Sequence, residues 1–241
     1  SRSSGVVLAD RRIRPPPLLT TLAGMVSIPD VPDVSAQLLA DLLAVLGPLP
    51  LWGGSVIELA GELLLLLVLV VWLRVWVLAR GADAKVMAVV LAVPAGAGLA
   101  WGASEVLKQA LQVDRPCRLL PSFPGWAVCA APGDWSLPSN HAAIAGALTV
   151  AVAVAAWRIG APIATAVVLV AGPCAAVSRV LAGAHFPHDV AAGAMLGGIV
   201  AVVVILVFDR LAPRPLERLR ARRRAVSLLG TARPPRRGPD R

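Results

Sequence analysis

The residues best suited to chemistry lie in one short segment between two long apolar runs. This segment, residues 178–189, contains Arg179, His185 and Asp189. If a helix resumes near His185, the histidine and the aspartate are four positions apart and share one face. The carboxylate can then hold one imidazole nitrogen and leave the other free to attack an electrophile, while the Arg179 guanidinium suits a phosphate or a carboxylate. The alternative is a loop between membrane helices whose charged side chains simply face water.

Two more polar segments precede this one. Lys108 and Arg115 are seven positions apart, two helical turns, and can project the same way if a helix persists. Ser139, Asn140 and His141 follow a proline and open an apolar run, where the first amide groups of a helix are free to bind phosphate oxygens. Each piece has a simpler explanation, since basic residues at span ends extend toward water and Ser or Asn often caps a helix. Three cations with hydroxyl and backbone donors nevertheless describe an anion site, and the combination favours phosphate chemistry.

The composition indicates a membrane protein. Of 241 residues, 57% are hydrophobic and 15% are charged, and the apolar runs reach membrane length. We therefore expect an all-α, polytopic membrane bundle of about six helices. Its expected parts are a flexible N-terminal segment (1–33), a membrane domain (34–209) and an arginine-rich tail (210–241). Residues 1–33 lack a continuous apolar core, so no cleavable signal peptide is expected there.

Five apolar runs are clear candidates for membrane spans, at residues 56–78, 86–107, 141–157, 163–177 and 190–208. Residues 34–47 have helical periodicity but are short for a span. An interfacial helix, a re-entrant helix and the inner half of a tilted span all fit them, and we favour a sixth helix here. Glu58 and Glu62 should face the protein interior or water, because carboxylates are costly at membrane depth. Alternating the five clear spans puts all three polar segments on one side of the membrane.

The net charge of +9 is concentrated at the C-terminus. Residues 210–241 contain eleven arginines and two acidic residues, a surplus equal to the whole net charge. Because this tail follows an apolar run and has no interleaved aromatic residues, it indicates a cytoplasmic tail near membrane lipid, with no nucleic-acid partner. The polar segments then lie on the extracytoplasmic side of a multi-pass plasma-membrane protein.

The three polar segments resemble the type 2 phosphatidic acid phosphatases, the lipid phosphate phosphatase superfamily that shares its site with vanadium haloperoxidases. The family pattern is Lys-x6-Arg-Pro, then Pro-Ser-Gly-His, then Ser-Arg-x5-His-x3-Asp. The chain matches the first pattern from Lys108 to Pro116 and the third from Ser178 to Asp189 at every spacing. In the second, Asn140 replaces the glycine. Asparagine tolerates unusual backbone angles, so we expect the site to be retained, and its side chain can add a donor to the phosphate.

The resemblance, which covers roughly residues 50–208, implies a helical membrane fold and a phosphatase reaction. His185 is expected to attack phosphorus and form a phosphohistidine, with Asp189 holding its ring. His141 is expected to protonate the leaving oxygen and later to activate water. No Asp/Glu cluster suggests a metal, so we expect no metal and no other cofactor, and we expect His188 to be an exposed neighbour. The expected phosphate-binding groups are Lys108, Arg115, Ser139, Arg179 and the backbone around Asn140.

Within this family we favour a polyprenyl diphosphate of the undecaprenyl or decaprenyl type as the substrate. The support is a compact, bacterial-looking chain rich in Ala, Leu, Val, Gly and Arg, and the acidic residues near the site. The alternatives are a phosphatidic acid or phosphatidylglycerophosphate phosphatase and, in another class, a protein that binds or transports a lipid phosphate without catalysis. The His–Asp pair argues against the last, since binding alone needs no nucleophile. The haloperoxidase branch is soluble, unlike this chain.

Two of the three cysteines lie in the long loop on the expected outer side. These are Cys117 and Cys129, whereas Cys174 lies inside a span. We expect a Cys117–Cys129 disulfide, which would close a loop worth about 3 kcal/mol in the chain-entropy account. Two unpaired thiols are the alternative.

Overall fold

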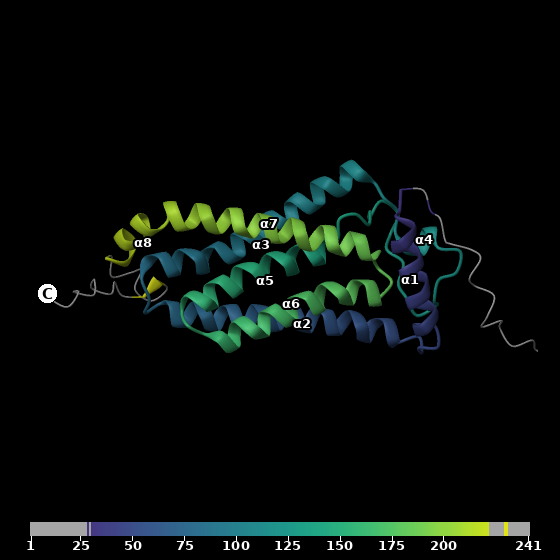
Figure 1. Ribbon diagram of the computed structural model, residues 1–241, viewed down its shortest axis with the longest axis horizontal. Coiled ribbons are helices and arrows are strands. Elements are labelled where there is room, and N and C mark those ends of the chain that lie inside the picture. Colours follow the sequence, from purple (N-terminus) through teal and green to yellow (C-terminus); the bar gives the residue numbers. More distant parts are fainter. Residues whose placement is uncertain (1–27, 29, 222–228, 231–241) are drawn as a thin grey trace, which may run out of the picture.

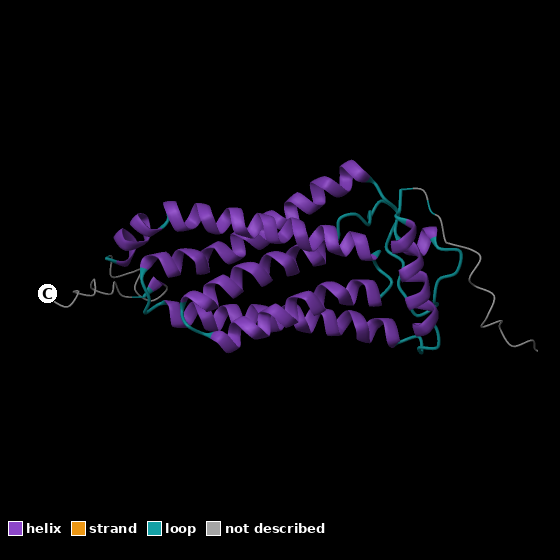
Figure 2. Ribbon diagram, viewed as in Figure 1, coloured by secondary structure: helices purple, strands orange, loops and turns teal. Residues whose placement is uncertain are grey.

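The computed structural model describes residues 28, 30–221, 229 and 230. In these residues the chain forms helices and no β-strand (Figure 2), which confirms the all-α prediction. Most of the predicted N-terminal segment 1–33 and much of the predicted tail 210–241 lie outside the described residues.

Five helices are long and apolar enough to cross a membrane. They run along the long axis of the molecule (Figure 1). Helix α5 packs against all four of the others and is the most buried, whereas α2 is the least buried. Large apolar side chains of α2, including Leu59, Leu63 and Leu66, are exposed, as expected where the surrounding solvent is lipid. The five are α2 (Gly53–Ala79), α3 (Ala84–Leu111), α5 (Asn140–Arg158), α6 (Pro162–Leu181) and α7 (Pro187–Leu211).

Helix α1 (Asp33–Leu46) lies across one end of the bundle instead of along it (Figure 1). Its 14 residues give a length of about 21 Å, shorter than the ~30 Å hydrocarbon core of a bilayer. One face, including Ala36, Leu39 and Leu43, is buried against the bundle. The predicted sixth helix therefore exists, but it closes the end of a five-span bundle and does not form a sixth span.

Two short helices lie at opposite ends of the bundle. Helix α4 (Pro116–Leu119) is beside α1, and α8 (Pro213–Arg220) is at the far end, as Figure 1 shows. The end that carries α1 and α4 is also the end at which the three polar segments meet.

Small residues let α7 approach α5 closely at this end. A Cβ atom added to Gly193 would overlap the carbonyl oxygen of Ser139, and one added to Gly197 would overlap that of Ala143. The backbone N–H of Ser139 also donates to the carbonyl oxygen of Asp189 at 3.1 Å. These contacts hold the start of α5, which carries the second polar segment, against the start of α7, which carries the third.

The loop between α4 and α5 covers the same end. Cys117 and Cys129 form a disulfide, with 5.6 Å between their Cα atoms, so the predicted pairing is confirmed. The indole nitrogen of Trp126 in this loop donates to the carbonyl oxygen of Leu46 at 3.1 Å and ties the loop to α1. Cys174 on α6 is a free thiol.

Candidate active site

A cavity of about 280 Å³ lies at the end of the bundle covered by α1 and the α4–α5 loop. It is bounded by the start of α2, the C-terminal ends of α3 and α6, the start of α5 and the connection between α6 and α7. The sequence therefore identified groups that the fold does bring together. Six of the predicted site residues line the cavity: Lys108, Arg115, Asn140, His141, Arg179 and His185.

His185 is 3% exposed and is held on both sides of its ring. Its Nε2 atom lies 3.0 Å from Nη1 of Arg115. Because a guanidinium can only donate, Nε2 must accept, which places the proton of the neutral ring on Nδ1. The turn that delivers His185 from the end of α6 contains Gly183 at φ +70°, a backbone angle that favours glycine. His185 lines the cavity, and its Nε2 atom carries the lone pair that a nucleophile needs, which in this structure accepts a hydrogen bond from Arg115.

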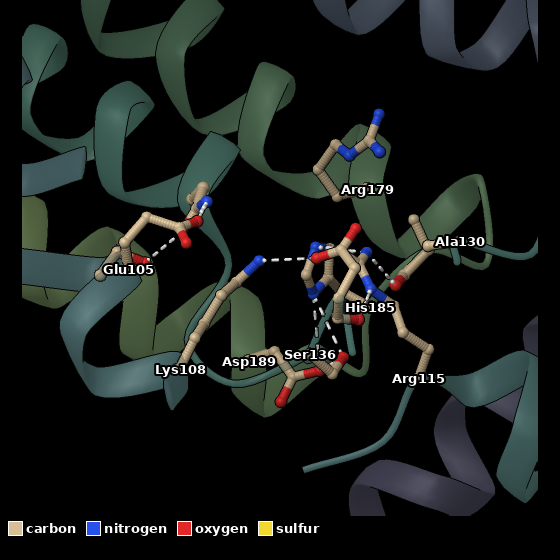
Figure 3. Close-up of polar contacts among 12 residues, drawn as sticks. Glu105, Lys108, Arg115, Ala130, Ser136, Arg179, His185 and Asp189 are labelled. Atoms are coloured by element: carbon tan, nitrogen blue, oxygen red, sulfur yellow. Dashed lines mark hydrogen bonds and ion pairs between the residues drawn. The ribbon is translucent and has the colours of Figure 1, made fainter. Parts of the chain in front are cut away.

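Ser136 links His185 to Asp189, a contact that sequence reasoning missed. The Ser136 hydroxyl donates to Asp189 Oδ2 at 2.5 Å and lies 3.3 Å from His185 Nδ1. The direct distance from Nδ1 to Asp189 Oδ2 is 3.7 Å, beyond hydrogen-bonding range. The predicted His–Asp pair is therefore linked mainly through the Ser136 hydroxyl and not by a direct hydrogen bond. Ser136 and Asp189 lie together below His185 in Figure 3.

Asp189 is fully buried and also closes the first turn of α7. Its Oδ2 atom accepts the backbone N–H of Phe186 at 2.9 Å, as an acidic residue in the first turn of a helix commonly does. Asp189 Oδ2 thus accepts hydrogen bonds from both the Ser136 hydroxyl and the backbone N–H of Phe186, at the start of α7. The same carboxylate that orients His185 fixes where α7 begins.

His188 is half-buried and is not the exposed neighbour that the sequence suggested. Its Nε2 atom lies 3.1 Å from Asp189 Oδ1, and its Nδ1 atom is 2.9 Å from the hydroxyl of Ser35 on α1. The backbone N–H of His188 also donates to that hydroxyl at 3.2 Å. Its ring stacks on Phe186 with 5.7 Å between centroids. Helix α1 is thereby connected to the buried carboxylate behind His185.

Cationic side chains of the site are paired with carboxylates. Lys108 and Arg115 converge from opposite sides of Figure 3, and Asp134 lies 3.3 Å and 2.7 Å from their respective nitrogens. Arg179 stands apart in the same view, with a guanidinium nitrogen 3.8 Å from Glu58. Each of the three cations predicted to bind phosphate therefore lies beside a carboxylate in this structure.

His141 has a carboxylate partner of its own. Its Nε2 atom lies 2.6 Å from Glu62 Oε1. Glu58 and Glu62 were expected to face the protein interior or water, and both face the cavity residues. Because a carboxylate accepts, this contact places a proton on His141 Nε2.

Ser139 and Asn140 have mainly positional contacts. Ser139 is the N-cap of α5 and its hydroxyl accepts the backbone N–H of Ala142 at 3.5 Å. Asn140 begins α5 with an ordinary helical backbone, and its side chain accepts from Ser104 at 2.7 Å and donates to Glu105. Asparagine can replace the family glycine here because no left-handed backbone angle is needed. Its side-chain nitrogen, which was expected to add a donor to the phosphate, donates to Glu105 on α3 in this structure.

The protonation of His185 gives a direct test of this geometry. Burial lowers the pKa of His185 from 6.5 to about 4, an effect that the nearby carboxylate of Asp189 only partly offsets and the charge of Arg115 strengthens. The chain has three histidines, so NMR of isotope-labelled histidine in detergent gives few signals, and a His185→Gln variant assigns this one. We expect its signal to show a neutral ring from neutral pH down to near pH 4. A titration near the ordinary value of about 6.5 would contradict the buried, Arg115-bound ring.

Comparison with known proteins places the fold and the motifs in one family. A sequence model described as the PAP2 superfamily matches residues 84–212, more than half of the chain, and this region contains all three polar segments. The structure is similar to the crystal structure of a transmembrane PAP2-type phosphatidylglycerolphosphate phosphatase from Bacillus subtilis, with a TM-score of 0.55 and 19% sequence identity. The similarity covers 74% of this chain and 86% of that chain. A search of curated proteins found no match. The matched segment runs through the helices that carry His141, His185 and Asp189, and the chain is a multi-pass membrane protein that belongs to the PAP2 superfamily.

Proposed function

We propose that this membrane lipid phosphatase hydrolyses a polyprenyl diphosphate to the monophosphate, without a metal, through a phosphohistidine on His185. The observation that carries the proposal is the state of His185, which has an unprotonated Nε2 atom and lines a cavity together with Lys108, Arg115 and Arg179. A binding protein has no need of a buried imidazole whose second nitrogen is linked to a carboxylate.

The first chemical step follows from this arrangement. His185 Nε2 gives up its hydrogen bond from Arg115 Nη1 and forms a bond to phosphorus, while the bond from phosphorus to the leaving oxygen breaks in line with it. Lys108 and Arg115 neutralise the charge on the transferring phosphoryl group, and Arg179 lies on another wall of the cavity, where it can contact the rest of the substrate. His141 gives its Nε2 proton to the leaving oxygen, which takes the place of Glu62 as the acceptor.

The second step regenerates the histidine. His141, now deprotonated, takes a proton from water as that water attacks the phosphohistidine. The phosphorus–nitrogen bond breaks, inorganic phosphate is released, and the electron pair returns to His185 Nε2. Ser136 and Asp189 hold the proton on Nδ1 in both steps, which keeps the ring oriented.

The separation of the cations supports a diphosphate substrate. Lys108 and Arg115 lie near His185, where the transferred phosphoryl group must be, while Arg179 stands on another wall of the cavity (Figure 3). A second phosphate beside the first would have Arg179 as its partner. The alternative is a glycerolipid phosphate, since the structurally similar Bacillus subtilis protein is a phosphatidylglycerolphosphate phosphatase.

Phosphate release by the purified protein from a panel of lipids tests the proposal. The panel is a polyprenyl diphosphate, phosphatidic acid and phosphatidylglycerophosphate, each assayed with a metal chelator present and with His185→Ala as the matched control. We expect release with the chelator and the highest kcat/KM for the diphosphate. A higher kcat/KM for either glycerolipid would reject the substrate, and no release from any lipid would favour a binding protein.

The proposed orientation puts the site on the extracytoplasmic face. Its support is the positive-inside rule: Arg80, Lys85, Arg158 and Arg210 lie at the ends of spans opposite the site, together with α8. In a Cys174→Ser background, a cysteine replacing exposed Ser122 should react with an impermeant reagent on intact cells, whereas one replacing exposed Arg218 should not. The reverse pattern would invert the topology.

A further inference from the structure

The carboxylate of Asp134 contacts Lys108 and Arg115. In the proposed function, these two cations bind the substrate phosphate. The Oδ1 atom of Asp134 lies 2.7 Å from Nη2 of Arg115 and 3.3 Å from Nζ of Lys108. One anionic oxygen shared by a guanidinium and an ammonium is also the arrangement expected for a bound phosphate oxygen. Asp134 lines the same cavity as His185. A phosphate oxygen that bridges the two cations in the same way would take the place of this carboxylate.

Arg115 does not depend on the Asp134 carboxylate for its position. Its Nε atom donates to the backbone carbonyl oxygen of Asp134 at 3.1 Å, and its Nη1 atom donates to the carbonyl oxygen of Ala184 at 3.0 Å and to His185 Nε2. These contacts fix the guanidinium through groups that a side-chain substitution at position 134 leaves in place. The side-chain carboxylate accepts from the remaining nitrogen, Nη2, which has two N–H groups.

The carboxylate is also the most exposed of the three charged groups in this cluster. The side chains of Lys108 and Arg115 are 4% and 8% exposed, whereas that of Asp134 is 47% exposed and extends from a loop. Asp134 can therefore turn into water while the two cations stay, at the small free-energy cost typical of a half-exposed ion pair. Burial alone would raise the pKa of Asp134, but the hydrogen bond and charge of Arg115, with Lys108, hold that pKa below its usual value. The carboxylate thus stays ionised throughout the neutral pH range.

We propose that Asp134 is a specificity-determining residue that competes with the substrate phosphate for Lys108 and Arg115. The inference rests on the proposed function, because it takes these cations as the phosphate site. Weakly charged phosphates are the ones that this competition disfavours most, since they gain least from the two cations. A more highly charged group such as a diphosphate displaces the carboxylate more readily. Asp134 thus lets the cationic cavity discriminate between phosphate groups by their charge.

Binding of inorganic phosphate tests this competition without any lipid. Phosphate is titrated into the full-length protein in detergent, and the His185 NMR signal reports occupancy beside Arg115. Asp134→Asn removes the charge and keeps the shape, and we expect it to lower the Kd for phosphate by about 3- to 10-fold, the size expected for losing a half-exposed competitor of two cations. The matched control is Asp114→Asn, which breaks a similarly exposed pair at 2.6 Å between Asp114, in the connection from α3 to α4, and Arg118 of α4, both outside the cavity lining. We expect no change in its Kd.

The outcomes separate this inference from the proposed function. An unchanged or higher Kd in Asp134→Asn, with phosphate bound by the unsubstituted protein, would overturn the competition and leave the phosphatase assignment standing. An equal decrease of the Kd in Asp114→Asn would also overturn the competition. The lower Kd would then follow from the loss of any nearby negative charge, and not from the position of Asp134. If neither the unsubstituted protein nor Asp134→Asn binds phosphate, both the inference and the assignment of Lys108 and Arg115 fail. Asp134→Ala, with the His185 signal as a check of the fold, repeats the test with the side chain removed.

Discussion

Replacement of His185 by alanine is expected to lower phosphate release by at least about 10⁴-fold for every substrate, the scale seen when a covalent nucleophile is removed. The reason is that Nε2 of His185, a residue that lines the cavity, is the acceptor nitrogen held beside Arg115. The proton-bearing nitrogen of His141 faces Glu62 instead. The measurement is single-turnover release of phosphate from a polyprenyl diphosphate and from phosphatidic acid.

A comparison with His188→Ala makes this test specific. His188 lies three positions along the chain and touches the same carboxylate, but its ring does not line the cavity. Losing one network contact of about 1 kcal/mol should reduce the rate by about 10-fold or less. Equal losses in the two variants would mean that the segment acts through its packing and that His185 is no nucleophile.

His141→Ala is expected to affect the two classes of substrate unequally. A phosphate monoester leaves as an alkoxide, which needs a proton, so most of the about 10²- to 10⁴-fold contribution of a general acid should disappear. A polyprenyl diphosphate leaves as a phosphate monoester anion, which is a far better leaving group and needs the proton less. Some loss remains for both, since His141 also activates the water of the second step. The variant should therefore shift preference toward diphosphates.

Asp189→Asn is the matched comparison for His141→Ala. The carboxylate acts on His185 through Ser136, whatever the leaving group, so its loss should reduce the single-turnover rate on both substrate classes alike. Equal losses on monoester and diphosphate in His141→Ala as well would show that protonation of the leaving group is not the main role of His141. The predicted shift of His141→Ala toward diphosphates would then be wrong, even if the phosphatase assignment stood.

The sequence predicted which distant residues come together because its motifs lie at helix ends. Runs of apolar residues located the five spans, and alternating them brought Lys108, His141 and His185 to one side. The four-residue spacing from His185 to Asp189 was less informative about geometry. Proline at position 187 starts α7 two residues after the histidine, so His185 lies outside the helix and a serine fills the gap to Asp189.

Contacts between distant segments could not be predicted from the sequence. Ser136 and Asp134 are ordinary polar residues of a loop, and only its folding over the cavity brings them to His185 and Arg115. Helical periodicity in residues 34–47 fits an end helix as well as half a span. Nothing local indicates that Ser35, in the first turn of α1, will contact His188, which is 153 positions away.

In the proposed reaction phosphorus becomes covalently bound to His185, and this intermediate can be trapped. Protein mixed with a polyprenyl diphosphate carrying radioactive phosphorus in its terminal group is quenched in base within one turnover and digested. We predict a label that is stable in base, labile in acid and confined to the peptide that contains His185. It should be absent in His185→Gln and longer-lived in His141→Ala, which slows hydrolysis of the intermediate. Full turnover with no trapped label, or label on a peptide without His185, would contradict a phosphohistidine intermediate on His185.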